Sequence, residues 1–133
     1  MSFVKLLDLE TYGIELARQR VTFGSLLEVS HGTRVSKHAA YSARAEMDLR
    51  RYQISTITGH VHRQGRYQTK AGDRQIVAQE GGCLCGLEPE YGSWMDWAHG
   101  FTLFEIHDGH LDITPVSIQS DYTASVAGKH FKA

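Results

Sequence analysis

The sequence has 133 residues, a formal net charge of −1 and 41% hydrophobic residues, the proportions of one ordinary globular domain. A near-neutral charge gives no broad electrostatic basis for binding nucleic acid or an anionic membrane, and no apolar stretch is long enough to span a bilayer. The only cysteines are Cys83 and Cys85, too few for a disulfide framework, so we expect a reducing, cytoplasmic location.

The first half of the chain predicts a strand, a helix and a second strand. Residues 4–12 are expected to form a short helix or turn that ends at Gly13. "SLLEVS" at 25–30 is a short apolar run and predicts a buried strand. A serine N-cap at position 36 predicts a helix to about residue 52. "ISTITG" at 54–59 is rich in β-branched residues and predicts the next strand.

The second half predicts short strands joined by turns. "RYQTK" and "RQIVAQ" flank "AGD", which predicts a hairpin over 66–79. "FTLFEIHDGHLDITPVSI" at 101–118 predicts another hairpin, since Asp-Gly at its centre favours a type I′ turn. Residues 119–133 are polar and are expected to be a frayed tail. The order of elements predicts one domain over 1–118, of the α/β or α+β class, with a mixed sheet.

Histidines follow two of the predicted strands where each strand ends. His31 comes directly after "LLEVS", and His60 and His62 follow "ISTIT" in "TGHVHRQG". Neutral imidazole is the commonest metal ligand, and the ends of adjacent strands in a strand–helix–strand unit meet at one rim. The three imidazoles therefore predict a metal site there. Taken alone, His31 is more simply a loop histidine, and many His-x-His pairs are solvated.

The remaining histidines and the cysteines favour simpler interpretations. His107 and His110 flank the predicted hairpin turn, where a solvated cross-strand pair is expected. Cys83 and Cys85 have side chains that can bind soft metals, but "GGCLC" is more typical of small residues packed where backbones approach closely. No Gly-rich phosphate loop and no His-Glu-x-x-His motif is present.

Beyond these patterns, parts of the sequence resemble a known protein family. "GHVH" at 59–62, preceded by "SHG" at 30–32, resembles the last two metal motifs of the calcineurin-like metallophosphoesterases. "HGTRVSKHAAYSARAEMD", "EGGCLCGLEPEY" and "WMDWAHGF" are similar to a bacterial and phage branch of that superfamily. The resemblance covers roughly residues 5–118. It implies the C-terminal half of a metallophosphoesterase-type β-sandwich, with flanking helices and C-terminal β-hairpins.

Carried over by position, the resemblance implies a two-metal centre. His31 and His60 would bind the second metal ion and His62 the first. Members of the family commonly hold manganese, iron, zinc or nickel and cleave phosphate mono- or diesters, because two metals clamp the phosphate and activate water. Arg34 and Arg63 are near the expected ligands, and we expect them to bind the substrate phosphate, although solvated loop charges are the alternative.

The family's earlier motifs, Asp-x-His, Gly-Asp and Asn-His, have no counterpart here. Asp8 and Glu10 stand in neither an Asp-x-His nor a Gly-Asp context. Imidazoles alone provide no bridging carboxylate, so two metal ions at short separation would repel each other. A half domain also leaves strand edges and an apolar sheet face uncovered. We therefore expect a complementary N-terminal half on another chain, or a homo-oligomer.

Two other interpretations stay open. The chain can be a catalytically inactive, truncated phosphoesterase-like domain that serves as a binding or structural module, for example in a phage particle. It can also hold a single metal ion on three histidines, an arrangement that with one water suits zinc.

Overall fold

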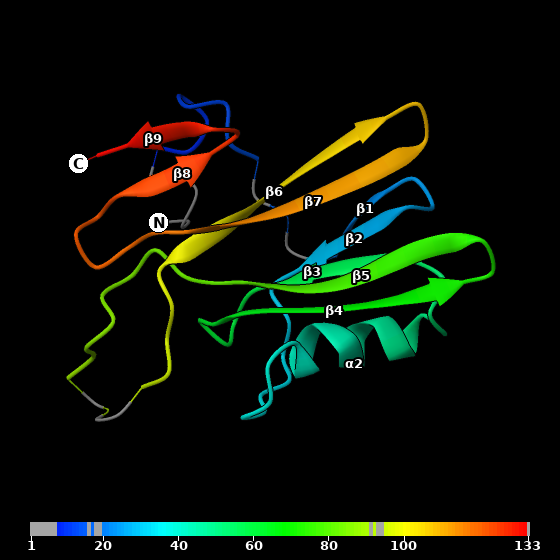
Figure 1. The fold of residues 1–133 in the computed structure, drawn as a ribbon, viewed down its shortest axis with the longest axis horizontal. Coiled ribbons are helices and arrows are strands. Elements are labelled where there is room, and N and C mark those ends of the chain that lie inside the picture. Colours follow the sequence, from blue (N-terminus) through cyan, green and yellow to red (C-terminus); the bar gives the residue numbers. More distant parts are fainter. Residues whose placement is uncertain (1–7, 16, 18–19, 91, 93–94, 133) are drawn as a thin grey trace.

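The computed structural model describes residues 8–15, 17, 20–90, 92 and 95–132. Its centre is a mixed sheet of five strands in the order β1-β2-β3-β5-β4 (Figure 1). The three middle strands run parallel, and the two edge strands run antiparallel to their neighbours. The strands are β1 (Val21–Phe23), β2 (Leu27–Ser30), β3 (Ser55–Thr58), β4 (Gln64–Ala71) and β5 (Arg74–Gly81). The predicted α+β class with a mixed sheet is confirmed.

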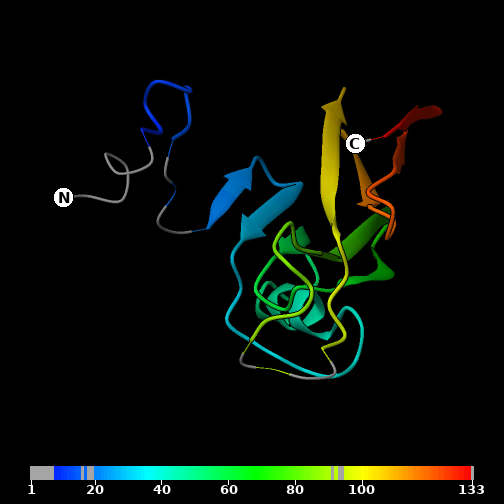
Figure 2. The ribbon, with the colours of Figure 1, turned by 90° about the vertical axis from the view of Figure 1, so that its left-hand side faces the viewer.

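The sheet is covered by a helix on one face and by a hairpin on the other (Figures 1 and 2). The helix is α2 (Tyr41–Leu49), and the hairpin joins β6 (Gly100–His107) to β7 (His110–Ser117). Alternate side chains of a strand point to opposite faces, so β5 contributes to two cores. Toward the helix the buried core is Ala43, Met47, Ile76 and Ala78. Toward the hairpin it is Leu27, Ile57, Val77 and Ile113.

Helix α2 begins later than its sequence predicts, because its N-terminal cap comes from another strand. Ala40 precedes the helix in a left-handed conformation, with φ of 59°. The buried carboxylate of Glu80, on β5, accepts hydrogen bonds from the N–H groups of Ala40 and Ser42, each at 3.0 Å. Ser36 instead accepts a bond from the N–H of His38, at 3.2 Å. The predicted serine cap is therefore wrong, and the helix is shorter at both ends than the 36–52 range.

Both predicted hairpins of the second half are confirmed. Strands β4 and β5 pair along their whole length, and so do β6 and β7. The β6–β7 turn has φ of 49° at Asp108 and 78° at Gly109, the positive values that a type I′ turn requires. His107 and His110 face each other across that turn and are exposed, as predicted for a solvated pair.

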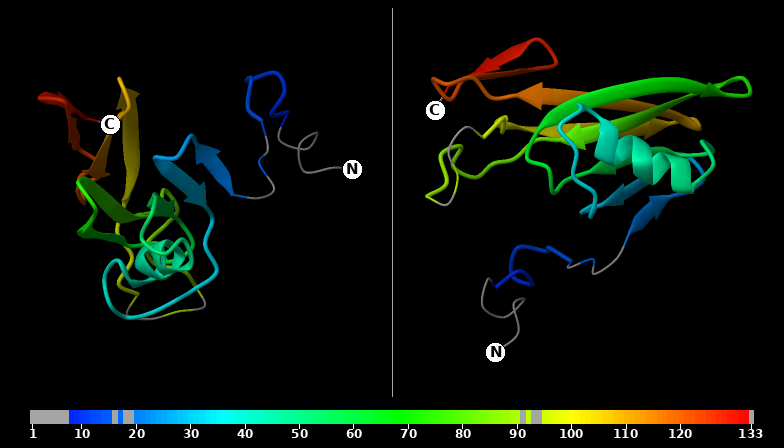
Figure 3. Two further views of the ribbon diagram at one scale, coloured as in Figure 1. Left: turned by 90° about the vertical axis from the view of Figure 1, so that its right-hand side faces the viewer. Right: turned by 90° about the horizontal axis from the view of Figure 1, so that it is seen from below.

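The two ends of the chain differ from expectation in part. The expected frayed tail instead contains a third hairpin, of β8 (Ala124–Val126) and β9 (Lys129–Phe131), whose turn has positive φ at Ala127 and Gly128. Residues 8–13 form turns that end at Gly13, and the earlier part of the predicted N-terminal segment lies outside the described residues. Residues 8–15 extend away from the sheet (Figures 2 and 3). No helix of the described part is both long and apolar enough to cross a bilayer.

Candidate metal centre

The turn that follows β3 holds two histidines in an unusual backbone conformation. His60 has φ of 69° and His62 has φ of 57°, both in the left-handed region that non-glycine residues rarely adopt. Val61, between them, is buried, and its N–H donates to the carbonyl of Gly59 at 2.8 Å. Each such residue costs on the order of 1–3 kcal/mol, and these conformations cluster at functional sites. The turn is therefore held in a strained shape that presents two imidazoles.

His31 and His60 lie together at the ends of two neighbouring strands. Strands β2 and β3 run parallel, so the residues that follow them emerge at the same edge of the sheet. His31 Nε2 lies 3.1 Å from His60 Nδ1. Two imidazole nitrogens that are each about 2.1 Å from one metal ion lie about 3.0–3.4 Å apart. The distance therefore fits a shared ion, and it also fits a hydrogen bond from one ring to the other.

A hollow of about 250 Å³ borders His31, and the positive and negative side chains that line it neutralise each other. Arg20 and Glu46 line it, and the Arg20 guanidinium lies 2.8 Å from the Glu46 carboxylate. Arg20 also pairs with the buried Glu28 at 3.3 Å, and Arg50 pairs with the other oxygen of Glu28. Two arginines thus neutralise two buried glutamates, and the Glu46 carboxylate that lines the hollow beside His31 is engaged in an ion pair.

His62 faces different neighbours from the other two histidines. Its Nδ1 lies 3.7 Å from Cys85 Sγ, and its ring meets the ring of Trp97 edge-on with centroids 4.3 Å apart. The ligand atoms of His62, Cys83 and Cys85 all lie within 4.8 Å of one another. The structure therefore pairs His31 with His60 and groups His62 with two thiols. The interpretation of both cysteines as packing residues missed this group.

Backbone hydrogen bonds fix the group of His62 and the two cysteines. The N–H of Ala98 donates to the carbonyl of His62 at 2.8 Å, and the N–H of Cys83 donates to the carbonyl of Ala98 at 3.1 Å. The N–H of Gly100 then donates to the carbonyl of Cys83 at 3.0 Å. At Gly82, with φ of 81°, a Cβ would lie 2.9 Å from the Gly100 carbonyl, so only glycine fits. The segment 98–100 therefore holds the two turns together.

The two thiols have different surroundings. Cys83 is buried and Cys85 is exposed, and both are free. Burial, with a smaller contribution from the hydrogen bond to Cys85, raises the pKa of the Cys83 thiol. Metal ions bind the thiolate, so a metal at this place would have to displace the Cys83 proton.

Of the two arginines predicted to bind substrate, Arg63 is engaged elsewhere. The largely buried Arg63 lies 2.8 Å from Asp96 and also donates to the carbonyl of Ser36. The hydrogen bond from Arg63 holds the pKa of the Asp96 carboxyl below its usual value. Arg34 lines a hollow along α2. No hydrogen bond or ion pair joins either arginine to a histidine within the described residues, and their role toward substrate stays a prediction.

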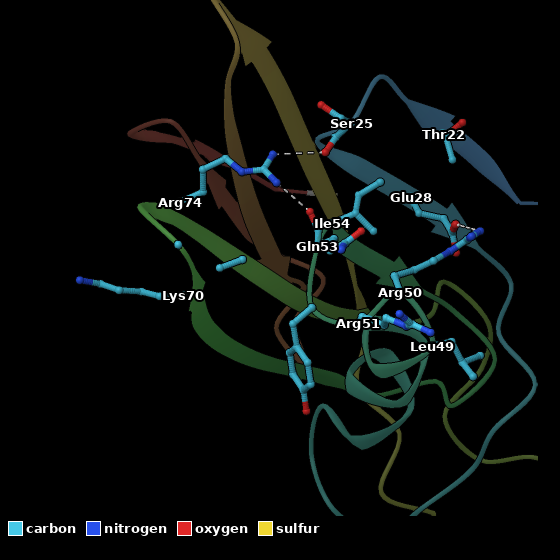
Figure 4. A pocket seen from close by; sticks show the side chains of 13 residues that line it. Thr22, Ser25, Glu28, Leu49, Arg50, Arg51, Gln53, Ile54, Lys70 and Arg74 are labelled. Carbon is cyan, nitrogen blue, oxygen red and sulfur yellow. Dashed lines mark hydrogen bonds and ion pairs between the residues drawn. The ribbon is translucent and has the colours of Figure 1, made fainter.

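A larger hollow, about 1060 Å³, lies at the other end of the parallel strands (Figure 4). Its lining includes residues that precede β2 and β3, Glu28 of β2 and the turn between β4 and β5, whereas His31 and His60 follow β2 and β3. Arg74 donates to two backbone carbonyls there, at 2.9 and 3.4 Å, and Arg50 pairs with Glu28. This hollow is therefore separate from the candidate metal centre.

The donor atoms thus form two sets, an exposed imidazole pair and an imidazole with two thiols. Among the described His, Cys, Asp and Glu side chains, one group of three has ligand atoms close enough together to hold one ion. It consists of His62, Cys83 and Cys85. No protein-family model, curated protein or solved structure matches the chain.

Proposed function

We propose that the chain is part of a metal-dependent phosphoesterase that hydrolyses phosphate mono- or diesters at a two-metal centre. The observation that carries the proposal is the 3.1 Å distance between His31 Nε2 and His60 Nδ1. The pair follows two adjacent parallel strands, the edge at which open α/β sheets bind their ligands. It also coincides with the "SHG" and "GHVH" motifs that resemble those of calcineurin-like metallophosphoesterases.

In this proposal His31 and His60 hold one divalent ion and His62 holds the other. Manganese, iron, zinc and nickel all accept imidazole nitrogen. Two such ions supply Lewis-acid activation of the phosphate and of water. The chain contributes fixed ligand directions, because the left-handed backbone at His60 and His62 and the buried Val61 between them hold the turn in one shape.

The carboxylate ligands are proposed to come from another chain, a complementary N-terminal half or a second copy. Among the described side chains, neither His31 nor His60 belongs to a group of three candidate ligands. Two neutral imidazoles leave the repulsion between two divalent cations uncompensated. Strand β1 offers a place for a partner, since it is a sheet edge and all three of its residues are exposed. The mixed sheet with its hairpin layer would then be half of a metallophosphoesterase-type β-sandwich.

The test is hydrolysis of bis(p-nitrophenyl) phosphate by the tagged chain, purified with its partner from the source cells and supplied with Mn²⁺. We expect manganese-dependent hydrolysis that falls at least about 100-fold in His31→Ala or His60→Ala, equivalent to about 2.7 kcal/mol in the barrier. His110→Ala, at the exposed β6–β7 turn, is the matched control and should keep full activity. An intact complex without hydrolysis, or with equal rates in all variants, would favour the inactive binding module.

A further inference from the structure

His62 belongs to a group of three soft and borderline donors. His62 Nδ1 is 3.7 Å from Cys85 Sγ, and Cys83 Sγ completes a set with all atoms within 4.8 Å. Nitrogen at about 2.1 Å and sulfur at about 2.3 Å from one tetrahedral ion lie about 3.6–3.8 Å apart. We infer that His62, Cys83 and Cys85 form a thiolate–imidazole site for zinc or another thiophilic divalent ion.

The donor set determines which metal this site takes. Thiolates prefer zinc over the harder manganese and magnesium ions. Two thiolates also cancel the charge of one divalent ion, which the neutral His31–His60 pair cannot do. The site therefore needs no carboxylate from another chain. The inferred site goes beyond the proposed phosphoesterase centre and shares only His62 with it. Its ion would be the metal ion that His62 holds in that centre.

Three protein ligands leave a tetrahedral ion with one open position. His99 is nearby, but its Nε2 lies 2.6 Å from the carbonyl of Cys85 and is already engaged. Cys85 is exposed, so solvent reaches the group at this ligand. Structural zinc sites have four protein ligands, whereas catalytic sites keep a position for water or substrate. The Cys₂His set therefore favours a site that accepts an exogenous ligand.

The site is also preorganised. The hydrogen bonds of Ala98 to His62 and Cys83 fix the two turns at one separation. The left-handed His62 and the obligatory glycine at position 82 set the directions of the ligands. Trp97 packs edge-on against the His62 ring. Ligands held by packing and backbone bonds lose little freedom when they bind an ion.

The experiment uses the whole chain, purified with reductant, stripped with EDTA and titrated with Co²⁺ as a spectroscopic substitute for zinc. We expect one equivalent of Co²⁺ to give the thiolate charge-transfer absorption of a tetrahedral site, and Zn²⁺ but not Mn²⁺ to displace it. Cys85→Ser, at an exposed position, should remove that absorption and weaken Zn²⁺ binding by at least about 100-fold, more than the loss of an outer hydrogen bond costs. His62→Ala should do the same.

His31→Ala separates this inference from the proposed phosphoesterase. It removes a ligand of the histidine pair and should leave the Co²⁺ absorption unchanged, while hydrolysis is lost. Circular dichroism confirms that each variant is folded, and the exposed Cys85 keeps the test valid even if the buried Cys83 tolerates no change. The inference is overturned if the folded chain gives no thiolate absorption, if Cys85→Ser binds Zn²⁺ as the parent does, or if His31→Ala removes the absorption.

Discussion

Glu80 caps a helix whose N-cap residue, Ala40, lies forty residues before it in the sequence. Its fully buried carboxylate accepts the N–H groups of Ala40 and Ser42, each at 3.0 Å, and so satisfies two donors at the start of α2. An anionic acceptor at a helix N-terminus is also favoured by the helix dipole. This one side chain therefore links β5 to the helix that covers it.

Replacing Glu80 with alanine should destabilise the protein by about 2–4 kcal/mol, since two buried N–H groups lose a charged acceptor. Glu80→Gln keeps one oxygen acceptor and should cost less. Urea unfolding followed by circular dichroism measures both. Glu105→Ala, an exposed carboxylate on β6, is the control and should change stability by less than about 0.5 kcal/mol. Equal stability of Glu80→Ala and Glu105→Ala would show that the cap contributes nothing.

The same contact explains which elements the sequence could predict. Hairpins depend on residues next to each other, and Asp108-Gly109 was sufficient to predict one. The start of α2 depends on Glu80, which no local pattern connects to residue 40. The C-terminal hairpin was missed because Ala127, which carries the first positive φ of its turn, is not a typical turn residue.

The candidate site, too, could be predicted from the sequence only in part. The His31–His60 pair could be predicted, because each residue follows a strand and parallel neighbours end at one edge. The group of His62 with Cys83 and Cys85 could not, because it depends on how the segment 98–100 bonds to both turns. The short Cys-x-Cys spacing was the one local signal for it.

If His31 and His60 share one metal ion, their contributions to hydrolysis should not add. Either His31→Ala or His60→Ala leaves the ion one protein ligand short, so each should lose at least about 100-fold in kcat/KM. The double variant should be little worse than either single one. Rates of Mn²⁺-dependent phosphodiester hydrolysis by the purified complex test this. Losses that multiply in the double variant would mean that the two rings act independently.

The Arg63–Asp96 ion pair should make stability depend on pH. Because Arg63 lowers the pKa of Asp96 in the folded state, the pair stabilises the protein above the ordinary Asp pKa. That stability is lost as the pH falls through the lowered folded-state value. The effect should be small, since the Asp96 side chain is 67% exposed and solvent screens the pair.

Asp96→Asn removes this contribution and isolates it. The variant should be less stable than the parent at about pH 7. The difference should shrink toward about pH 3, because Asp96 of the parent takes up its proton more readily in the unfolded than in the folded state. Urea midpoints at the two pH values measure the difference. Asp112→Asn, at an exposed position of β7, controls for the loss of one negative charge. A difference that grows at low pH would contradict the assigned direction.

Charge on the exposed edge of the sheet should weaken assembly with the proposed partner. Val21, on β1, is 37% exposed at a sheet edge, and a lysine there opposes pairing with another strand. Val21→Lys should therefore lower the yield of the co-purified complex and its hydrolysis together, while the chain itself stays folded by circular dichroism. Leu103→Lys changes a similarly exposed apolar residue on β6 and should leave the complex intact. A Val21→Lys chain that recovers its partner in full would place the interface on another surface, because a charge on an edge strand opposes pairing with a further strand.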